Sequence, residues 1–191
     1  MWPWDHLAIG YLVVSLWRRG RSRRPPGEAE AIAAVLGSQL PDLIDKPLGW
    51  RTSLLPSGHS MAHSLTVAVP TAVVVYLLAR RYGRADVGAA FSLAYLVHLP
   101  ADVVYPMVLG RSPNLAFLFW PFVDIPASQT GAFAGRVLEL VVQFLAFLRT
   151  PQGFTFLLIE LSLLGVALLL WRRDGWPGVA SVVRTVDPRS V

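Results

Sequence analysis

Three arginine clusters, each directly after an apolar segment, are the strongest constraint on how this chain folds. They are Arg18–Arg24, Arg80–Arg84 and Arg172–Arg173. Basic residues that flank transmembrane helices are retained on the cytoplasmic side of the membrane. The pattern therefore predicts a membrane helix bundle whose arginine-bearing helix ends all lie on the cytoplasmic side.

The composition supports a membrane protein. Hydrophobic residues make up 54% of the 191 residues and charged residues only 15%, whereas soluble domains carry about 25% charged residues. The 17 basic and 12 acidic residues give a net charge of +5. Because the arginines follow apolar segments, we attribute them to topology and expect no nucleic-acid partner. The chain has no cysteine, which excludes disulfides and thiolate ligation of zinc.

Apolar periodicity predicts an all-α, polytopic bundle of about five or six apolar helices. Some are short for a bilayer core, which needs about 20 helical residues, and prolines should kink others. We expect one membrane-embedded domain over residues 1–173 and a polar tail over 174–191, with an irregular or re-entrant stretch over 110–135. The predicted segments are roughly 4–17, 28–40, 60–79, 87–108, 137–148 and 154–171.

Histidines and aspartates gather at the segment ends opposite the arginines. With the arginines placed in the cytoplasm, all of these motifs converge on one face of the bundle, which we predict to be extracytoplasmic. Ionisable groups inside a membrane or at its edge cost free energy and are usually functional. The motifs are Asp5-His6, the pair Asp42 and Asp45, the pair His59 and His63, and the pair His98 and Asp102.

The spacing of these residues favours a metal site. His59 and His63 are four residues apart, as are His98 and Asp102, and such pairs share one face of a helix. Imidazole and carboxylate ligands without sulfur suit Zn²⁺ first, with Mn²⁺ or Fe²⁺ as alternatives. The predicted ligands are His6, Asp42, His63, His98 and Asp102.

The remaining polar residues of the motifs have open roles. Asp45 is the candidate general base, although pairing with Lys46 or Arg51 would explain it equally well. Asp5 either caps the first helix or supports a ligand. His59 is a ligand, a neighbour of a ligand or a bystander.

The order of these motifs resembles a known family. Trp-Pro-Trp-Asp-His at the start, Leu-Pro-Asp-Leu-Ile-Asp at 40–45, Ala-His-Ser-Leu at 62–65 and the His98/Asp102 pair are similar to membrane-bound, metal-dependent hydrolases of the LexA-binding, inner-membrane-associated type. The resemblance covers about residues 1–105 and implies a distant similarity to zinc-dependent phospholipase C. Family members carry a histidine where this chain has Gly58, so a role for His59 does not transfer.

These observations predict a hydrolase of the inner membrane. A bound metal would activate water against a phosphoester of a lipid or another membrane-proximal substrate, and membrane lipids are the expected partners. One alternative is a non-catalytic metal-binding scaffold or regulator, because structural and catalytic zinc sites differ only in an open coordination position. A small transporter is a further alternative, but it would place its charges at mid-membrane depth.

Overall fold

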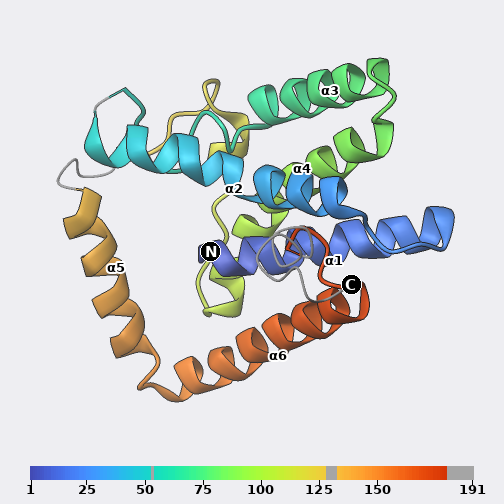
Figure 1. Cartoon of the computed structure of the whole chain (residues 1–191). Coiled ribbons are helices and arrows are strands. Elements are labelled where there is room, and N and C mark those ends of the chain that lie inside the picture. The colour runs from blue at the N-terminus through green and yellow to red at the C-terminus, as the bar shows by residue number, and fades with distance from the viewer. Residues whose placement is uncertain (53, 128–132, 180–191) are drawn as a thin grey trace.

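The regular structure of the described residues is entirely helical. A computed structural model describes residues 1–52, 54–127 and 133–179, which form six α-helices and one 3₁₀ turn without strands (Figure 1). The prediction of an all-α fold is therefore confirmed. The elements are α1 (Pro3–Ser22), α2 (Glu28–Arg51), α3 (Leu65–Arg81), α4 (Ala85–Val108), η1 (Ala116–Phe119), α5 (Phe133–Phe147) and α6 (Pro151–Arg173).

Fewer helices than predicted are able to cross a membrane. Within the described residues, only α4 and α6 are long and apolar enough, rather than five or six helices. α3 has only 17 residues. α1 and α2 are long enough, but both carry charge. α1 has arginines at its carboxy-terminal end and site residues near its start, whereas α2 begins with Glu28 and Glu30 and carries its site residues and Arg51 in its carboxy-terminal half. Part of the charge that lowers the hydropathy of α1 and α2 therefore comes from the candidate site residues.

Two predicted boundaries around the site were wrong. α2 does not end before Pro41 but continues through Pro41 and Pro47 to Arg51. α3 begins at Leu65, with Ser64 as its N-cap residue, so residues 54–64 before it are irregular. His59 and His63 therefore lie in this loop and do not share the face of a helix.

Small residues let α1, α2 and α4 pack closely. The buried core between them contains Val14, Ala33, Ala34, Ala90 and Ala94. At Gly37 of α2, an added Cβ would lie only 2.3 Å from the carbonyl oxygen of Phe91 on α4. Close backbone approach through small side chains is typical of membrane helix pairs. The same packing sets the spacing between the site residues of α2 and α4.

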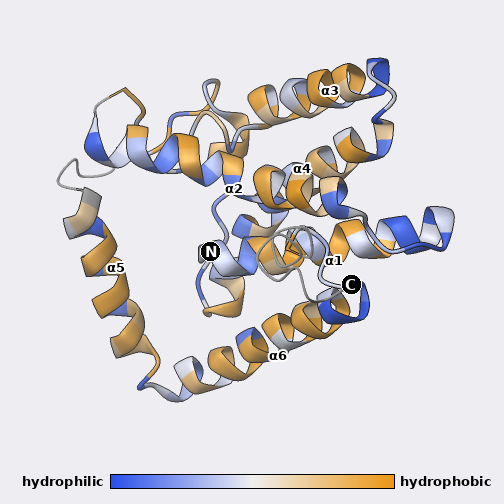
Figure 2. Cartoon of the chain, in the orientation of Figure 1, coloured by the Kyte–Doolittle hydropathy of each residue, from blue (hydrophilic) through white to orange (hydrophobic). Residues whose placement is uncertain are grey.

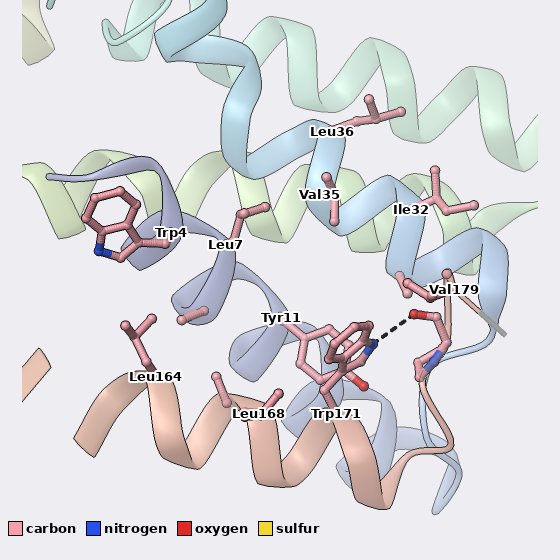
Figure 3. A pocket seen from close by; sticks show the side chains of 15 residues that line it. Trp4, Leu7, Tyr11, Ile32, Val35, Leu36, Leu164, Leu168, Trp171 and Val179 are labelled. Atoms are coloured by element: carbon pink, nitrogen blue, oxygen red, sulfur yellow. Dashed lines mark hydrogen bonds between the residues drawn. The ribbon is translucent and has the colours of Figure 1, made fainter. Parts of the chain in front are cut away.

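α6 packs along α1 and is held there at its carboxy-terminal end (Figure 1). Asp174, directly after α6, accepts hydrogen bonds from Tyr11 at 2.7 Å and Ser15 at 2.6 Å and pairs with Arg19. The predicted tail thus begins in contact with α1, while residues 180–191 lie outside the described residues. An apolar cavity of about 460 Å³ lies between α1, α2 and α6 (Figure 3).

The arginine-bearing ends of the helices lie on one side of the molecule. Figure 2 shows hydrophilic ends of α1, α3 and α6 on the right, and an almost wholly apolar α5 on the left. The carboxy-terminal part of α2 and the amino terminus lie away from those arginine ends. This separation agrees with the charge pattern of the sequence. α5 starts at Phe133, within the stretch 110–135 that was predicted to be irregular.

Candidate metal centre

Four chain segments meet at one buried cluster. α1 contributes His6, α2 contributes Asp42, the loop before α3 contributes His63, and α4 contributes His98 and Asp102. All five side chains are buried. The structure therefore brings together every residue that was predicted to be a ligand, although they span nearly a hundred residues of sequence.

Four of these side chains form a compact group. One ligand atom each from Asp42, His63, His98 and Asp102 lies within 4.8 Å of the others. The Nε2 atoms of His63 and His98 are 3.1 Å apart. Asp102 Oδ2 lies 3.4 Å from Nε2 of His63 and 3.2 Å from Nε2 of His98. Asp42 Oδ1 lies 3.4 Å and 3.9 Å from the same two nitrogens.

These separations fit a tetrahedral ion. Zinc binds histidine nitrogen and carboxylate oxygen at about 2.0–2.1 Å, which places neighbouring ligand atoms of a tetrahedron about 3.3 Å apart. The five separations above, from 3.1 to 3.9 Å, scatter around that value. The donor set and its geometry thus suit a divalent cation such as Zn²⁺.

Hydrogen bonds outside the cluster fix the orientation of both histidine rings. Nδ1 of His63 bonds to Asp45 Oδ2 at 2.8 Å, and Nδ1 of His98 bonds to the backbone carbonyl oxygen of Ser38 at 2.7 Å. Both partners accept, so each Nδ1 donates and each Nε2 is turned toward the cluster, where its lone pair is available once no proton occupies it. Metal-binding histidines almost always have such a partner on the other nitrogen.

The cluster needs positive charge at its centre. Two carboxylate oxygens and two imidazole lone pairs converge there, and all four are acceptors. Burial by itself lowers the pKa of His63, but hydrogen bonds with Asp102, Asp42 and Asp45 outweigh it and raise the pKa to about 10. The same carboxylates that draw a proton onto His63 would attract a metal ion, which competes with protons for such ligands.

Asp45 is fully buried behind His63. Its oxygens accept hydrogen bonds from the backbone N–H groups of Ser60, Ala62 and His63 and from the His63 ring. Four donors thus occupy the two oxygens of this carboxylate. This arrangement fits an orienting carboxylate and leaves little capacity for the predicted general base.

His6 packs against the four-residue group. Its ring stacks on His98, with centroids 3.6 Å apart, and its Nε2 atom lies 3.3 Å from Asp102 Oδ1 and 4.0 Å from Asp42 Oδ2. Both ring nitrogens are buried without a hydrogen-bond partner. His6 therefore faces the second oxygen of each ligand carboxylate.

His59 forms the mouth of the centre. Its Nε2 atom lies 3.4 Å from Asp102 Oδ2, and its side chain is 39% exposed, in contrast to the buried rings of His6, His63 and His98. It lines two cavities of about 440 and 330 Å³, the smaller of which also reaches Asp102. Burial lowers the pKa of His59. This position fits a neighbour of the ligands, one of the roles left open by the sequence.

Asp5 serves the first helix and contacts α6. Its Oδ2 atom accepts from the backbone N–H of Trp2 at 3.1 Å, which is the capping role expected from the sequence. Its Oδ1 atom is buried without a hydrogen-bond partner, as is Glu160 Oε2. Glu160 accepts from the Trp4 indole at 2.6 Å, so it joins α6 to α1 beside the centre.

Some contacts of the centre were not predicted from the sequence, among them that of the Met1 ammonium group with Asp102 Oδ1 at 2.8 Å. The carbonyl group of Ser38 is a backbone acceptor, which no side-chain motif reveals. Lys46 lies 2.5 Å from Asp42 Oδ2 and so pairs with a predicted ligand rather than with Asp45. The four-residue spacing of Asp42 and Lys46 on α2 was the available clue.

The comparisons with known proteins assign a family. The family model of the YdjM inner membrane protein matches residues 1–175. The chain belongs to the YdjM inner membrane protein family. No curated protein and no solved structure matches it. YdjM membership and the two apolar helices indicate a membrane location, whereas the similarity to hydrolases and to phospholipase C stays a prediction.

Proposed function

We propose that this YdjM-family protein is a metal-dependent hydrolase of the inner membrane that acts on a phosphoester in a lipid or another membrane-proximal substrate. The observation that carries this proposal is the buried Asp42, His63, His98 and Asp102 group at the base of solvent-accessible cavities. A closed structural site would need no such access.

Each residue of the centre has a distinct task in this proposal. Asp42, His63, His98 and Asp102 hold the ion, most simply Zn²⁺, while Mn²⁺ and Fe²⁺ suit the same donors. A metal held by these residues would supply Lewis-acid chemistry, making a nearby water more acidic and polarising a phosphoryl oxygen. His6 faces the outer oxygens of the two carboxylates and either completes the coordination or supports a second ion.

We assign proton transfer to His59 and ring orientation to Asp45. His59 is the partly exposed imidazole at the cavity mouth, where a substrate would approach Asp102. A neutral imidazole in that place can accept a proton from water and return it to the leaving oxygen. Asp45, enclosed by backbone N–H groups, holds His63 in its ligating tautomer.

Activity and metal content together distinguish a hydrolase from a metal-binding scaffold. Purified protein loaded with Zn²⁺ would be assayed against a chromogenic phosphodiester, next to His59→Ala and His63→Ala variants. A hydrolase loses activity in both variants but keeps its metal in His59→Ala. Metal binding without hydrolysis of any phosphoester by the wild-type protein would favour the scaffold. Protein that binds no metal would reject both functions.

A further inference from the structure

We propose that the groove beside α5 binds a membrane lipid with an anionic phosphate headgroup. The phosphate would lie toward the metal centre and the hydrocarbon chain along α5. The groove has a volume of about 440 Å³, within the usual range of ligand sites. Its walls come from the start of α1, the ends of α2 and α4, and α5. The role of this lipid as a substrate rests on the proposed function.

Two side chains connect the groove to the centre. His59 lines the groove and lies 3.4 Å from Asp102 Oδ2. Lys46 also lines it and lies 2.5 Å from Asp42 Oδ2. A single side chain thus separates the groove from each candidate ligand carboxylate, His59 from Asp102 and Lys46 from Asp42. A headgroup at this end would meet the metal centre directly.

The charges on the groove select an anion. Lys46, Arg111 and Arg136 line it, and no acidic side chain of the described residues does. Arg111 makes no ion pair among the described residues. Arg136 donates to Glu139 at 2.6 Å through one terminal nitrogen, while its Nε atom is buried without a partner. Guanidinium groups with free N–H donors are suited to phosphate oxygens.

The α5 wall selects a hydrocarbon chain. Val137, Leu140, Phe144 and Phe147 line the groove, and Trp2 contacts Phe144 across it, with ring centroids 4.9 Å apart. Figure 2 shows α5 as almost continuously apolar. A free phosphate would leave this wall uncovered, and a neutral lipid would leave the arginines unmatched. An anionic lipid satisfies both parts of the groove.

The cavity between α1, α2 and α6 provides a contrast. It is similar in volume, about 460 Å³, but none of its described lining residues is charged (Figure 3). Leu164 and Leu168 project from α6 into it. An apolar cavity of this kind has no preference for a phosphate. Substitutions there are therefore suitable controls for substitutions in the groove.

The experiment measures amphiphile binding by the full chain in a neutral maltoside detergent. Calorimetric titrations would use dodecyl phosphate, dodecyl phosphocholine and inorganic phosphate. We expect dodecyl phosphate to bind at least about tenfold more tightly than either of the others, which corresponds to about 1.4 kcal/mol. Equal affinity for the two amphiphiles, or tighter binding of inorganic phosphate, would overturn the groove assignment.

Paired variants locate the binding. Arg111→Gln combined with Arg136→Gln should weaken dodecyl phosphate binding by about tenfold or more, since each 1.4 kcal/mol lost is a factor of ten. Phe144→Ala should also weaken it. The matched controls, Arg172→Gln with Arg173→Gln and Leu168→Ala, should leave it unchanged. Bound zinc is measured in every variant, and the groove variants should retain it. Unchanged affinity in folded, zinc-loaded groove variants contradicts the assignment.

The same measurements separate the two proposals. If dodecyl phosphate binds in the groove and the zinc-loaded protein hydrolyses no phosphoester, the groove stands and the hydrolase proposal fails. If the protein hydrolyses a water-soluble phosphoester and binds no amphiphile in the groove, the hydrolase stands and the groove assignment fails.

Discussion

The Nε2 atoms of His63 and His98 face each other at 3.1 Å, while both Nδ1 atoms are hydrogen-bonded outward. Two neutral rings in these tautomers would oppose lone pair to lone pair. A cation between them converts that repulsion into coordination, and Asp42 and Asp102 complete the set of donors. The outward hydrogen bonds therefore orient both rings for the centre.

Asp45→Asn is the most direct test of the outward hydrogen bonds. An amide NH₂ in place of either oxygen would face a backbone N–H donor. In place of Oδ2 it would also face Nδ1 of His63, so the ring would no longer be held in its ligating tautomer. Loss of such a partner lowers metal affinity by about 10- to 100-fold. Competition with a fluorescent zinc chelator measures this affinity. Asp86→Asn, on the exposed start of α4, is the matched control and should bind zinc as the wild type does. Equal affinity in folded Asp45→Asn would contradict the orienting role.

His6→Ala and His63→Ala should differ in their effect on the metal. His63 belongs to the four-residue group, so its removal should abolish tight binding. His6 faces only the outer carboxylate oxygens, so His6→Ala should retain an ion in the four-residue group. Elemental analysis of the purified variants gives the metal content per chain. A complete loss in His6→Ala, with the fold intact by circular dichroism, would show that His6 belongs to the primary ligand set.

The site was more predictable from the sequence than the course of the helices. His98 and Asp102 share a helical face because their spacing matches the helical period, and the arginine clusters placed the other motifs at the same end. The expected pairing of His59 and His63 on a helix was wrong, although the loop still brings their rings to 4.6 Å. Backbone hydrogen bonds to Asp45 hold that loop, and such bonds between distant segments leave no local sequence pattern.

Proline and charge explain the remaining differences. The segment predicted over about residues 28–40 stops before Pro41, because proline removes a backbone donor and clashes with the preceding turn. Tertiary packing of α2 against α4 outweighs that local preference. The number of membrane spans was overestimated because apolar segments were counted without their flanking charged turns, which belong to the same helices in α1 and α2.

Gly37→Ala should destabilise the bundle. The added Cβ would lie 2.3 Å from the Phe91 carbonyl oxygen, so α2 and α4 would have to separate. Strained packing of this kind costs about 1–3 kcal/mol. Gly165→Ala in α6 is the matched control, because its Cβ meets no atom within 4 Å and alanine favours a helix interior by about 1 kcal/mol. Thermal unfolding in detergent should show a lower midpoint for Gly37→Ala alone. Equal unfolding midpoints for Gly37→Ala and the wild type would mean that α2 and α4 do not approach each other this closely.

The side of the membrane on which the centre lies can be determined with two single cysteines in this cysteine-free chain. Leu54, in the loop next to the centre, is 74% exposed, and Tyr82, at the arginine-bearing end of α3, is 79% exposed. Because arginine-rich ends are retained in the cytoplasm, a membrane-impermeant maleimide should label Leu54→Cys in intact spheroplasts and label Tyr82→Cys only after the membrane is opened. Labelling of both in opened membranes is the control for reactivity. The reverse pattern would place the metal centre on the cytoplasmic side.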